Sequence, residues 1–246
     1  MVRTLVSIVI LTHNEWKYTS LCLRSLQQHT DAAHEVIVVD NGSTDESLAH
    51  LRQLRDRGRI RLLENDVNRG FAAGVNCGMD AAKGTYIALL NNDTVPSHRW
   101  LDNQLQLLQQ REGAGIVGPL SNRVLKRQKL RTDLTSLSEI HRFSQQHNRP
   151  DPAKWRKTPL LSGFCMVLTQ ELVRSIGLFD ERFGAGTYED NDYCRRALGA
   201  GFTCWIAGDT YVHHFGNKSF SRRGRAEFQK ILRQNRQYYS YKWRRK

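Results

Sequence analysis

The feature that most constrains the fold is a repeated order of buried strand, polar turn and helix along the first 110 residues. Apolar or β-branched runs cover residues 5–11, 35–39, 60–63 and 85–90, and a stretch with helical spacing of apolar residues follows each turn. Strands that alternate with helices form βαβ units, whose right-handed crossovers make the strands parallel. The sequence therefore predicts an α/β fold with a Rossmann-like, mostly parallel central sheet flanked by helices.

The regular order stops after Pro119. Residues 120–158 are polar, basic and weakly periodic, and they predict a long insertion or lid-like region. Strands are expected again at residues 159–168 and 202–207, with helices at 170–176 and from Tyr188 onward. We expect one compact domain over residues 1–220. A basic amphipathic helix is expected at residues 221–246.

The formal net charge of +13 is unevenly distributed. Residues 213–246 hold eleven Lys or Arg and one acid, residues 121–158 hold ten and three, and the rest of the chain has a net charge of −4. Because the central fold is not basic, we expect no nucleic-acid partner. The two basic segments instead indicate an acidic partner or surface.

The last segment allows two interpretations. Its apolar residues fall at roughly helical spacing among many cations, as in helices that lie on anionic membranes. Alternatively, the apolar stripe packs on the rest of the domain and the charges face water. The stripe consists of Phe228, Ile231, Leu232, Tyr239 and Trp243.

Three features predict a cytoplasmic protein. The five cysteines are widely spaced without a CxxC pair, which suits free thiols in a reducing compartment. No apolar stretch approaches the roughly 18 residues of a membrane span. The first strand begins at residue 5, which leaves no room for a signal peptide. If the basic tail binds lipid, the protein would be peripheral to the inner face of the membrane.

Polar turns at residues 12–15, 40–45 and 91–94 follow strands of the same predicted sheet. Each turn alone is explained by the tendency of Asp, Asn, Ser and Gly to form turns. Carboxyl ends of parallel strands meet at one edge, however, and three polar turns there favour a nucleotide site. No GxGxxG or P-loop follows the first strand, so hydride transfer and ATP hydrolysis are disfavoured. Groups suited to a base or ribose are those of Thr12, Asn14, Asp40 and Asn41.

Without a glycine- and lysine-rich loop, a bound diphosphate needs a divalent cation to offset its charge. Asp93 follows the strand at residues 85–90 and offers a hard carboxylate, although an Asx turn that caps the next helix also explains it. His213 and His214 follow the last predicted strand. A neutral imidazole there could complete a metal site, and a core or surface histidine is the alternative.

Glu189, Asp190 and Asp192 lie at the predicted start of a helix. The helix dipole favours acids at this position, so capping alone explains any one of them. A carboxylate held there, close to other acids, is also suited to act as a general base toward a substrate hydroxyl.

Six ordered motifs together resemble family 2 glycosyltransferases with the GT-A fold. They are SIVILTHN at 7–14, VVDNGSTD at 38–45, NRGF at 68–71, LNND at 90–93, GF at 163–164 and EDND at 189–192. The resemblance implies inverting transfer of a sugar from a nucleoside-diphosphate sugar to an acceptor hydroxyl. The acceptor would be a bacterial-type glycan, a lipid-linked sugar or a protein. Residues 1–119 would form the nucleotide-sugar-binding half and residues 120–220 the acceptor and catalytic half.

The resemblance also implies roles for single residues. Asp190 would be the base, and Asp93, with His213 as a further ligand, would bind Mg²⁺ or Mn²⁺. Asn91 and Asn92 stand at the first two positions of the metal-binding motif, so one carboxylate remains, and metal affinity is expected to be weak or dependent on bound nucleotide. The nucleotide sugar would be bound by Thr12, Asn14, Asp40, Asn41, Asn68, Gly70, Asn91 and Asn92.

Two other functions stay open at this point. A sugar nucleotidyltransferase shares a Rossmann-like core, but it normally has a Gly-rich loop with Lys or Arg after its first strand, where this chain has Thr-His-Asn-Glu. A non-catalytic module that binds nucleotides or polyanions could use the basic segments. Release of nucleoside diphosphate from a sugar donor would exclude a pure binding module.

Overall fold

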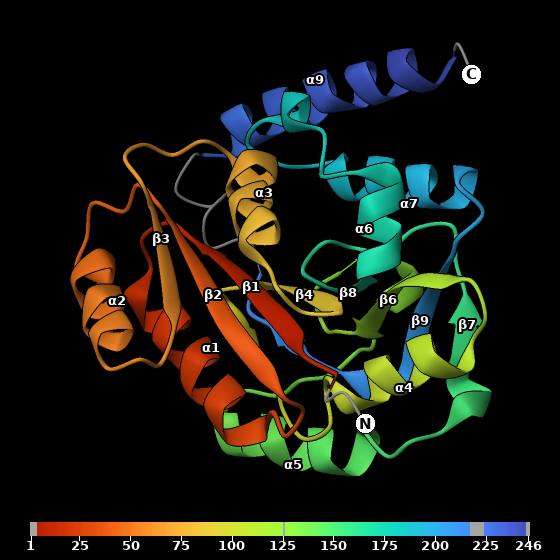
Figure 1. The fold of residues 1–246 in the computed structure, drawn as a ribbon, viewed down its shortest axis with the longest axis horizontal. Helices are drawn as coiled ribbons and strands as arrows, with labels where there is room; N and C mark the ends of the chain where they lie inside the picture. The colour runs from red at the N-terminus through yellow and green to blue at the C-terminus, as the bar shows by residue number, and fades with distance from the viewer. Residues whose placement is uncertain (1–3, 125, 217–223, 245–246) are drawn as a thin grey trace.

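The computed structural model describes residues 4–124, 126–216 and 224–244. Its centre is an eight-stranded sheet in the order β3-β2-β1-β4-β8-β6-β9-β7 (Figure 1). The strands are β1 (Val6–Thr12), β2 (His34–Asn41), β3 (Arg61–Asn65), β4 (Tyr86–Asn91), β6 (Ala114–Leu120), β7 (Trp155–Lys157), β8 (Cys165–Thr169) and β9 (Thr203–Tyr211). β8 runs antiparallel to β4 and β6, and β7 runs antiparallel to β9, whereas the other pairs are parallel. The predicted mostly parallel α/β sheet is confirmed.

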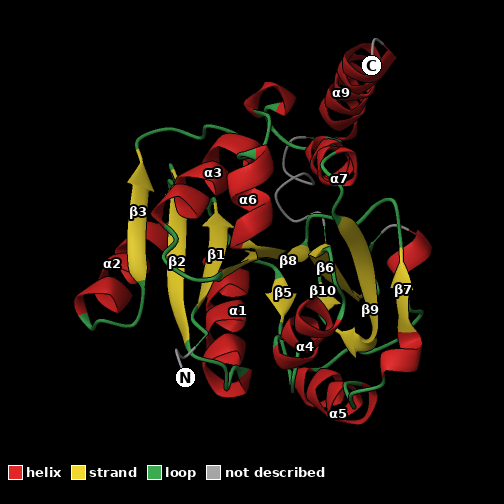
Figure 2. Cartoon of the chain, turned by 45° about the vertical axis from the view of Figure 1, so that its right-hand side comes forward, coloured by secondary structure: helices red, strands yellow, loops and turns green. Residues whose placement is uncertain are grey.

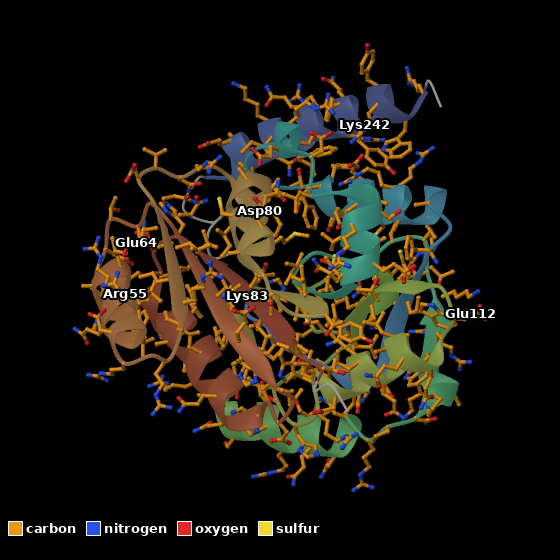
Figure 3. The ribbon with its side chains drawn as sticks, in the orientation of Figure 1. Arg55, Glu64, Asp80, Lys83, Glu112 and Lys242 are labelled. Carbon is orange, nitrogen blue, oxygen red and sulfur yellow. The ribbon has the colours of Figure 1, made fainter. Side chains whose placement is uncertain are left out.

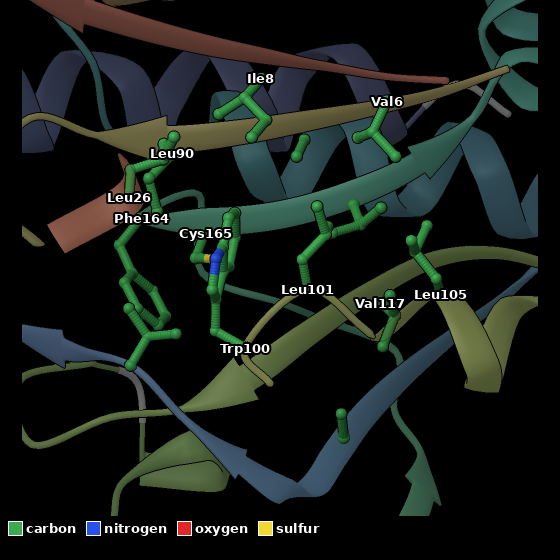
Figure 4. Packing of buried hydrophobic residues seen from close by; sticks show 14 of the residues in the cluster. Val6, Ile8, Leu26, Leu90, Trp100, Leu101, Leu105, Val117, Phe164 and Cys165 are labelled. Carbon is green, nitrogen blue, oxygen red and sulfur yellow. The ribbon is translucent and has the colours of Figure 1, made fainter. Parts of the chain in front are cut away.

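Helices cover both faces of the sheet (Figure 2). They are α1 (Trp16–His29), α2 (Ser47–Asp56), α3 (Phe71–Ala81), α4 (Asp102–Gln110), α5 (Leu137–His147), α6 (Gln170–Ile176), α7 (Glu189–Gly199) and α9 (Arg225–Arg244). Side chains alternate along β1, so Ile8 and Val9 belong to two separate apolar cores. The core around Ile8 includes residues of α1, α2 and α4, and Figure 4 shows Leu26 and Trp100 within it. The core around Val9 includes residues of α3, α6 and α7.

Two short strands, β5 (Thr94–Val95) and β10 (His213–His214), pair antiparallel outside the main sheet. No local sequence pattern predicts this pair, because its strands are two residues long and far apart in the chain. It joins the turn after β4 to the segment after β9, and so brings residues more than 100 positions apart to the same place. α4 begins at Asp102, after a turn that contains Arg99 with φ 54°.

The expectation of a lid-like insertion at residues 120–158 is wrong for its second half, which contains α5 and β7. Ser136 and Glu139 form a capping box, in which each side chain accepts a hydrogen bond from the other residue's backbone N–H. The S-x-x-E spacing of this box is a local signature of a helix start. Ile140 and Trp155 are buried, so the segment is anchored to the domain by apolar contacts as well.

α9 confirms the predicted basic C-terminal helix, although residues 221–223 and 245–246 of the prediction lie outside the described residues. The five apolar side chains of its stripe are half-buried, and the helix lies beside α7 in Figures 1 and 2. The partial burial of the stripe and the position of the helix agree with packing of α9 on the domain. Its exposed cations include Lys230, Arg233, Arg236 and Arg244.

All five cysteines are free, as the sequence predicted. Within the described part of the chain, no helix combines the length and the apolar character that crossing a membrane requires.

Candidate functional site

Asp40, at the end of β2, is the most deeply placed acid of the predicted nucleotide site. Its side chain is buried, and Oδ2 accepts a hydrogen bond from the backbone N–H of Ser43 at 3.0 Å. Oδ1 has no hydrogen-bond partner among the described residues. A buried oxygen without a donor is unfavourable, so this atom is suited to accept a hydrogen bond from a ligand.

Asn41 builds the loop beside Asp40. Its amide NH₂ donates to Oδ1 of Asn68 at 3.1 Å and to the carbonyl of Gly70 at 3.0 Å. Its Oδ1 accepts from the side-chain amide of Asn65 and from the backbone N–H of Arg69. Asn41, Asn68 and Gly70 are therefore brought together, and both donors and both acceptor positions of the Asn41 amide are used within the protein.

Other predicted residues also build the edge of the sheet. The hydroxyls of Thr12 and Thr19 lie 2.9 Å apart, and the amide of Asn92 donates to both of them. Asn14, with φ 61°, accepts hydrogen bonds from the backbone N–H groups of Thr44 and Asp45. Direct contact of Thr12, Asn14 and Asn92 with a nucleotide sugar stays a prediction.

Asp93 and His214 form the candidate metal site. Oδ1 of Asp93 lies 3.1 Å from Nε2 of His214, and Nδ1 of His214 lies 3.0 Å from the carbonyl oxygen of Arg123. Because a carbonyl only accepts, Nδ1 must carry hydrogen, which leaves the lone pair of a neutral ring on Nε2. The lone pairs of Nε2 and Oδ1 face each other at 3.1 Å, so a proton or a cation is needed between these two atoms. A histidine whose other nitrogen donates to a carbonyl is the usual arrangement of a metal ligand, so the pair fits a divalent cation.

This pair supplies only two protein ligands. No group of three or more His, Cys, Asp or Glu side chains in the described ranges could hold a metal ion. Mg²⁺ is commonly bound through one or two carboxylates together with substrate phosphates. The site therefore agrees with metal binding that depends on a bound diphosphate.

The structure brings His214, rather than His213, to Asp93. Nδ1 of His213 lies 3.0 Å from the hydroxyl of Tyr211, and its ring contacts Phe215. Burial, together with the nearby His214 and Arg123, lowers the pKa of His213 to about 4, so its ring is neutral. The adjacent histidines face different neighbours because side chains alternate along a strand. His213 as a ligand stays a prediction, and His214 is the better-placed residue.

Asp190, the predicted base, is the second residue of α7. Its Oδ2 accepts from the N–H of Gly163 at 3.0 Å and its Oδ1 from the N–H of Asn191 at 2.8 Å. Burial raises the pKa of Asp190, and these two donors partly offset that effect. Burial and the charge of Asp190 raise the pKa of Glu189 well above its ordinary value, and Oε2 of Glu189 has no partner among the described residues. The larger upward pKa shift falls on Glu189, so Asp190 is the carboxyl of this pair that ionises first as the pH rises.

Residues 163 and 164 connect the two parts of the site. Gly163 donates to Asp190, and the ring of Phe164 stacks on His214 with centroids 5.2 Å apart and planes 18° apart. The backbone of Asn91 donates to the carbonyl of Phe164 at 2.8 Å. Asp190 and His214 thus contact adjacent residues of one dipeptide, which is hydrogen-bonded to the last residue of β4. The sequence contained this Gly-Phe motif but did not indicate its connecting role.

A basic pocket of about 810 Å³ borders the metal pair. Arg123 connects the two, because its carbonyl oxygen lies 3.0 Å from Nδ1 of His214 and the residue also lines the pocket. Lys129 and Arg131 add two cations from the segment whose charge stood out in the sequence. The lining also includes one acid, Asp133, which the three cations outnumber, so the pocket is suited to an anionic group.

The fold and the site at its sheet edge define a GT-A glycosyltransferase domain. Residues 7–177 match the family described as Glycosyl transferase family 2, and the chain belongs to this family. The glycosyltransferase GlyG of Streptococcus pneumoniae is 29% identical over 120 residues, which is 48% of this chain and 40% of GlyG. Escherichia coli WfaP, named as a UDP-Glc:α-D-GlcNAc-diphosphoundecaprenol β-1,3-glucosyltransferase, is 30% identical over 43% of this chain and 41% of its own length.

The mannosyltransferase PcManGT of Pyrobaculum calidifontis, solved with GDP-Man and Mn²⁺, shares the fold with a TM-score of 0.65 at 20% identity. The match covers 86% of this chain and 57% of PcManGT. The predicted GT-A fold is confirmed. The matched part of this chain spans less than half of the length of GlyG and WfaP.

Proposed function

We propose that this chain is an inverting glycosyltransferase that moves a sugar from a nucleoside-diphosphate sugar to an acceptor hydroxyl. The observation that carries the proposal is the arrangement around Gly163 and Phe164. Asp190 accepts a hydrogen bond from Gly163, and the ring of His214, which contacts Asp93, stacks on Phe164. A base and a metal pair at one sheet edge are the two components that this reaction needs.

The nucleoside end of the donor would lie against β2. The unpartnered Oδ1 of Asp40 can accept a hydrogen bond from an N–H of the base, and the loop held by Asn41 would cover that side. Asp93 and His214 would hold Mg²⁺ or Mn²⁺ together with the donor diphosphate. When bound, the cation would offset the charge that develops on the leaving diphosphate. The complex of PcManGT with GDP-Man and Mn²⁺ supports this class of donor and of metal.

Asp190 would act on the acceptor. A free lone pair of its carboxylate takes the proton of the acceptor hydroxyl, while the N–H groups of Gly163 and Asn191 keep the carboxylate in place. The acceptor oxygen then forms a bond to the anomeric carbon from the face opposite the diphosphate. The bond between that carbon and the diphosphate breaks, and the configuration inverts.

The acceptor proposed for this chain is a lipid-linked sugar that carries a diphosphate. With this acceptor, the enzyme would act in polysaccharide synthesis at the cytoplasmic side of a membrane. The cations Arg123, Lys129 and Arg131 of the basic pocket suit such a group. The printed name of WfaP, whose acceptor is a sugar on diphosphoundecaprenol, supports this class. Glycan and protein acceptors are the alternatives.

A donor screen tests the proposal. The protein is mixed with UDP-, GDP- and dTDP-sugars, with and without Mn²⁺, and its melting temperature and the release of nucleoside diphosphate are measured. We expect one nucleotide class to raise the melting temperature in the presence of Mn²⁺ and to be hydrolysed slowly. Stabilisation without any release, with or without a lipid-linked acceptor, would instead identify a binding module. Consumption of a nucleoside triphosphate with a sugar phosphate would identify a nucleotidyltransferase.

A further inference from the structure

The loop that leads to Asp190 has an unfavourable backbone conformation. Gly184 and Gly186 have φ values of 56° and 122°, and Thr187 and Tyr188 follow with φ values of 78° and 67°. Positive φ is uncommon for residues other than glycine, and it is an outlier for a β-branched residue such as Thr187. Such a loop keeps its shape only when its surroundings hold it there.

Asn235 of α9 supplies that contact. Its side chain is buried, and its amide nitrogen lies 2.8 Å from the carbonyl of Phe183, 2.7 Å from that of Gly186 and 3.1 Å from that of Thr187. The hydroxyl oxygen of Thr187 is 3.2 Å from the same nitrogen. The two hydrogens of one amide thus serve four oxygens, all of which belong to the loop before Asp190.

α9 also binds the residues that follow Asp190. Asp192 is fully buried, and its Oδ1 accepts from Nζ of Lys242 at 2.7 Å and from Nε1 of Trp243 at 3.0 Å. Lys242 binds Asp180 as well, at 2.7 Å, and Figure 3 shows Lys242 between α9 and the helices beside it. The helix therefore contacts the chain on both sides of the predicted base.

The same loop touches the donor side of the site. The carbonyl of Gly184 accepts from the N–H of Phe71 at 3.0 Å, at the start of α3. A Cβ at Gly70 would collide with this carbonyl, so the two segments lie in close contact. Asn68 and Asn41 bind Gly70 from the other side. A continuous set of contacts thus leads from the predicted nucleotide loop to the loop held by Asn235.

We infer that Asn235 is a positioning residue for the transfer reaction, and that α9 holds the loop at residues 183–188 so that Asp190 stays at Gly163. This inference rests on the proposed function. It assigns the C-terminal helix to the catalytic machinery, in addition to any contact that its exposed cations make.

Substitutions that separate shape from hydrogen bonding test the inference. Asn235→Leu keeps a similar volume and removes the donors, and Asn235→Asp places a carboxylate against the four oxygens. Gln237→Ala, which removes an exposed amide from the same helix, is the control. A displacement of about 1 Å at a reacting group costs roughly 10²-fold in rate, so we expect kcat to fall by about that factor in Asn235→Leu and further in Asn235→Asp. The donor Kd should stay within about twofold, and the control should match wild type.

Two results would overturn the inference. One is an Asn235→Leu variant with the kcat of the wild type. The other is a variant in which kcat and donor affinity fall together with the melting temperature, since that indicates a purely structural role. Hydrogen exchange of peptides covering residues 183–192 gives a readout independent of turnover, and we expect faster exchange in Asn235→Leu than in Gln237→Ala. Equal exchange rates in Asn235→Leu and Gln237→Ala would also refute the inference that Asn235 holds this loop. A wild-type protein that neither binds nor hydrolyses any sugar nucleotide would instead refute the proposed function.

Discussion

Replacing Asp190 by Asn tests the proposed chemistry most directly. The amide keeps the size of the side chain but cannot accept a proton from the acceptor hydroxyl. General-base catalysis typically contributes 10²–10⁴ in rate, and this corresponds to about 2.7–5.5 kcal/mol of transition-state free energy. We therefore expect kcat to fall by roughly 10²–10⁴, while the Kd of the donor stays close to that of the wild type.

The structure also predicts the effect of this substitution on stability. The carboxylate of Asp190 accepts from two backbone donors, Gly163 and Asn191, whereas an amide has only one oxygen. One N–H would then face the NH₂ group, and an unsatisfied buried donor costs about 1–3 kcal/mol. Removing a charge that burial disfavours offsets part of this cost. The free energy of unfolding should therefore fall by less than the full cost of one unsatisfied donor.

The assay compares sugar transfer and donor binding in three proteins. Glu189→Gln is the matched control, because Glu189 keeps its proton in the folded chain and glutamine resembles that neutral form. We expect this control to keep most of its activity. In the wild type, kcat should decline on the acidic side through a pKa above the ordinary value of an aspartate, because burial raises the pKa of Asp190. An Asp190→Asn variant that transfers sugar at the wild-type rate would refute the assignment.

Three further predictions follow from the described contacts. Asp93→Ala and His214→Ala should each weaken Mn²⁺-dependent binding of nucleoside diphosphate, whereas His213→Ala should not. The loss should exceed the roughly 10–100-fold that follows when a residue hydrogen-bonded to a metal ligand is removed. Calorimetry that finds equal effects for the two histidine variants would contradict this prediction. The folded chain binds the proton of Glu189 more tightly than the unfolded chain does, so Glu189 reduces stability once the pH exceeds about 4.5. Glu189→Gln should raise the melting temperature at pH 8 and change it little at pH 4, and an equal change at both would disprove the linkage. Each cation near an anionic membrane contributes about 1 kcal/mol of binding free energy. Replacing the exposed Lys230, Arg233, Arg236 and Arg244 by Gln should therefore abolish sedimentation with anionic vesicles at low salt without unfolding α9. A wild-type protein that does not sediment with these vesicles would contradict a membrane role for the helix.

Local patterns were sufficient for much of the fold. The predicted strands before residue 120 correspond to β1 to β4, and the helix expected at residues 170–176 is α6. These predictions succeeded because strand and helix periodicity and turn residues are properties of neighbouring positions. The capping box at Ser136 and Glu139 is equally local, so the start of α5 is marked in the sequence as well.

The candidate site was only partly determined by local patterns. Asp40 and Asp93 lie at strand ends because each follows a buried run, and Asp190 begins a helix after a glycine-rich turn. The choice between His213 and His214 depends on the pairing of β10 with β5, which are separated by more than 100 residues. A sequence pattern shows that two neighbouring side chains face opposite ways, but only the partner strand decides which of them meets Asp93.

The same distinction applies to the amides and to α9. The sequence by itself placed Asn41 in the turn after β2, and the fold decided that its amide faces the loop at residues 65–70. It also determined that the C-terminal segment is a basic amphipathic helix. Only tertiary packing decided that Asn235, a polar residue between Gln234 and Arg236, is buried against the loop before Asp190. The physical reason is that helical spacing identifies which side chains share a face, whereas the acceptors that make burial of a polar group favourable come from a distant part of the chain.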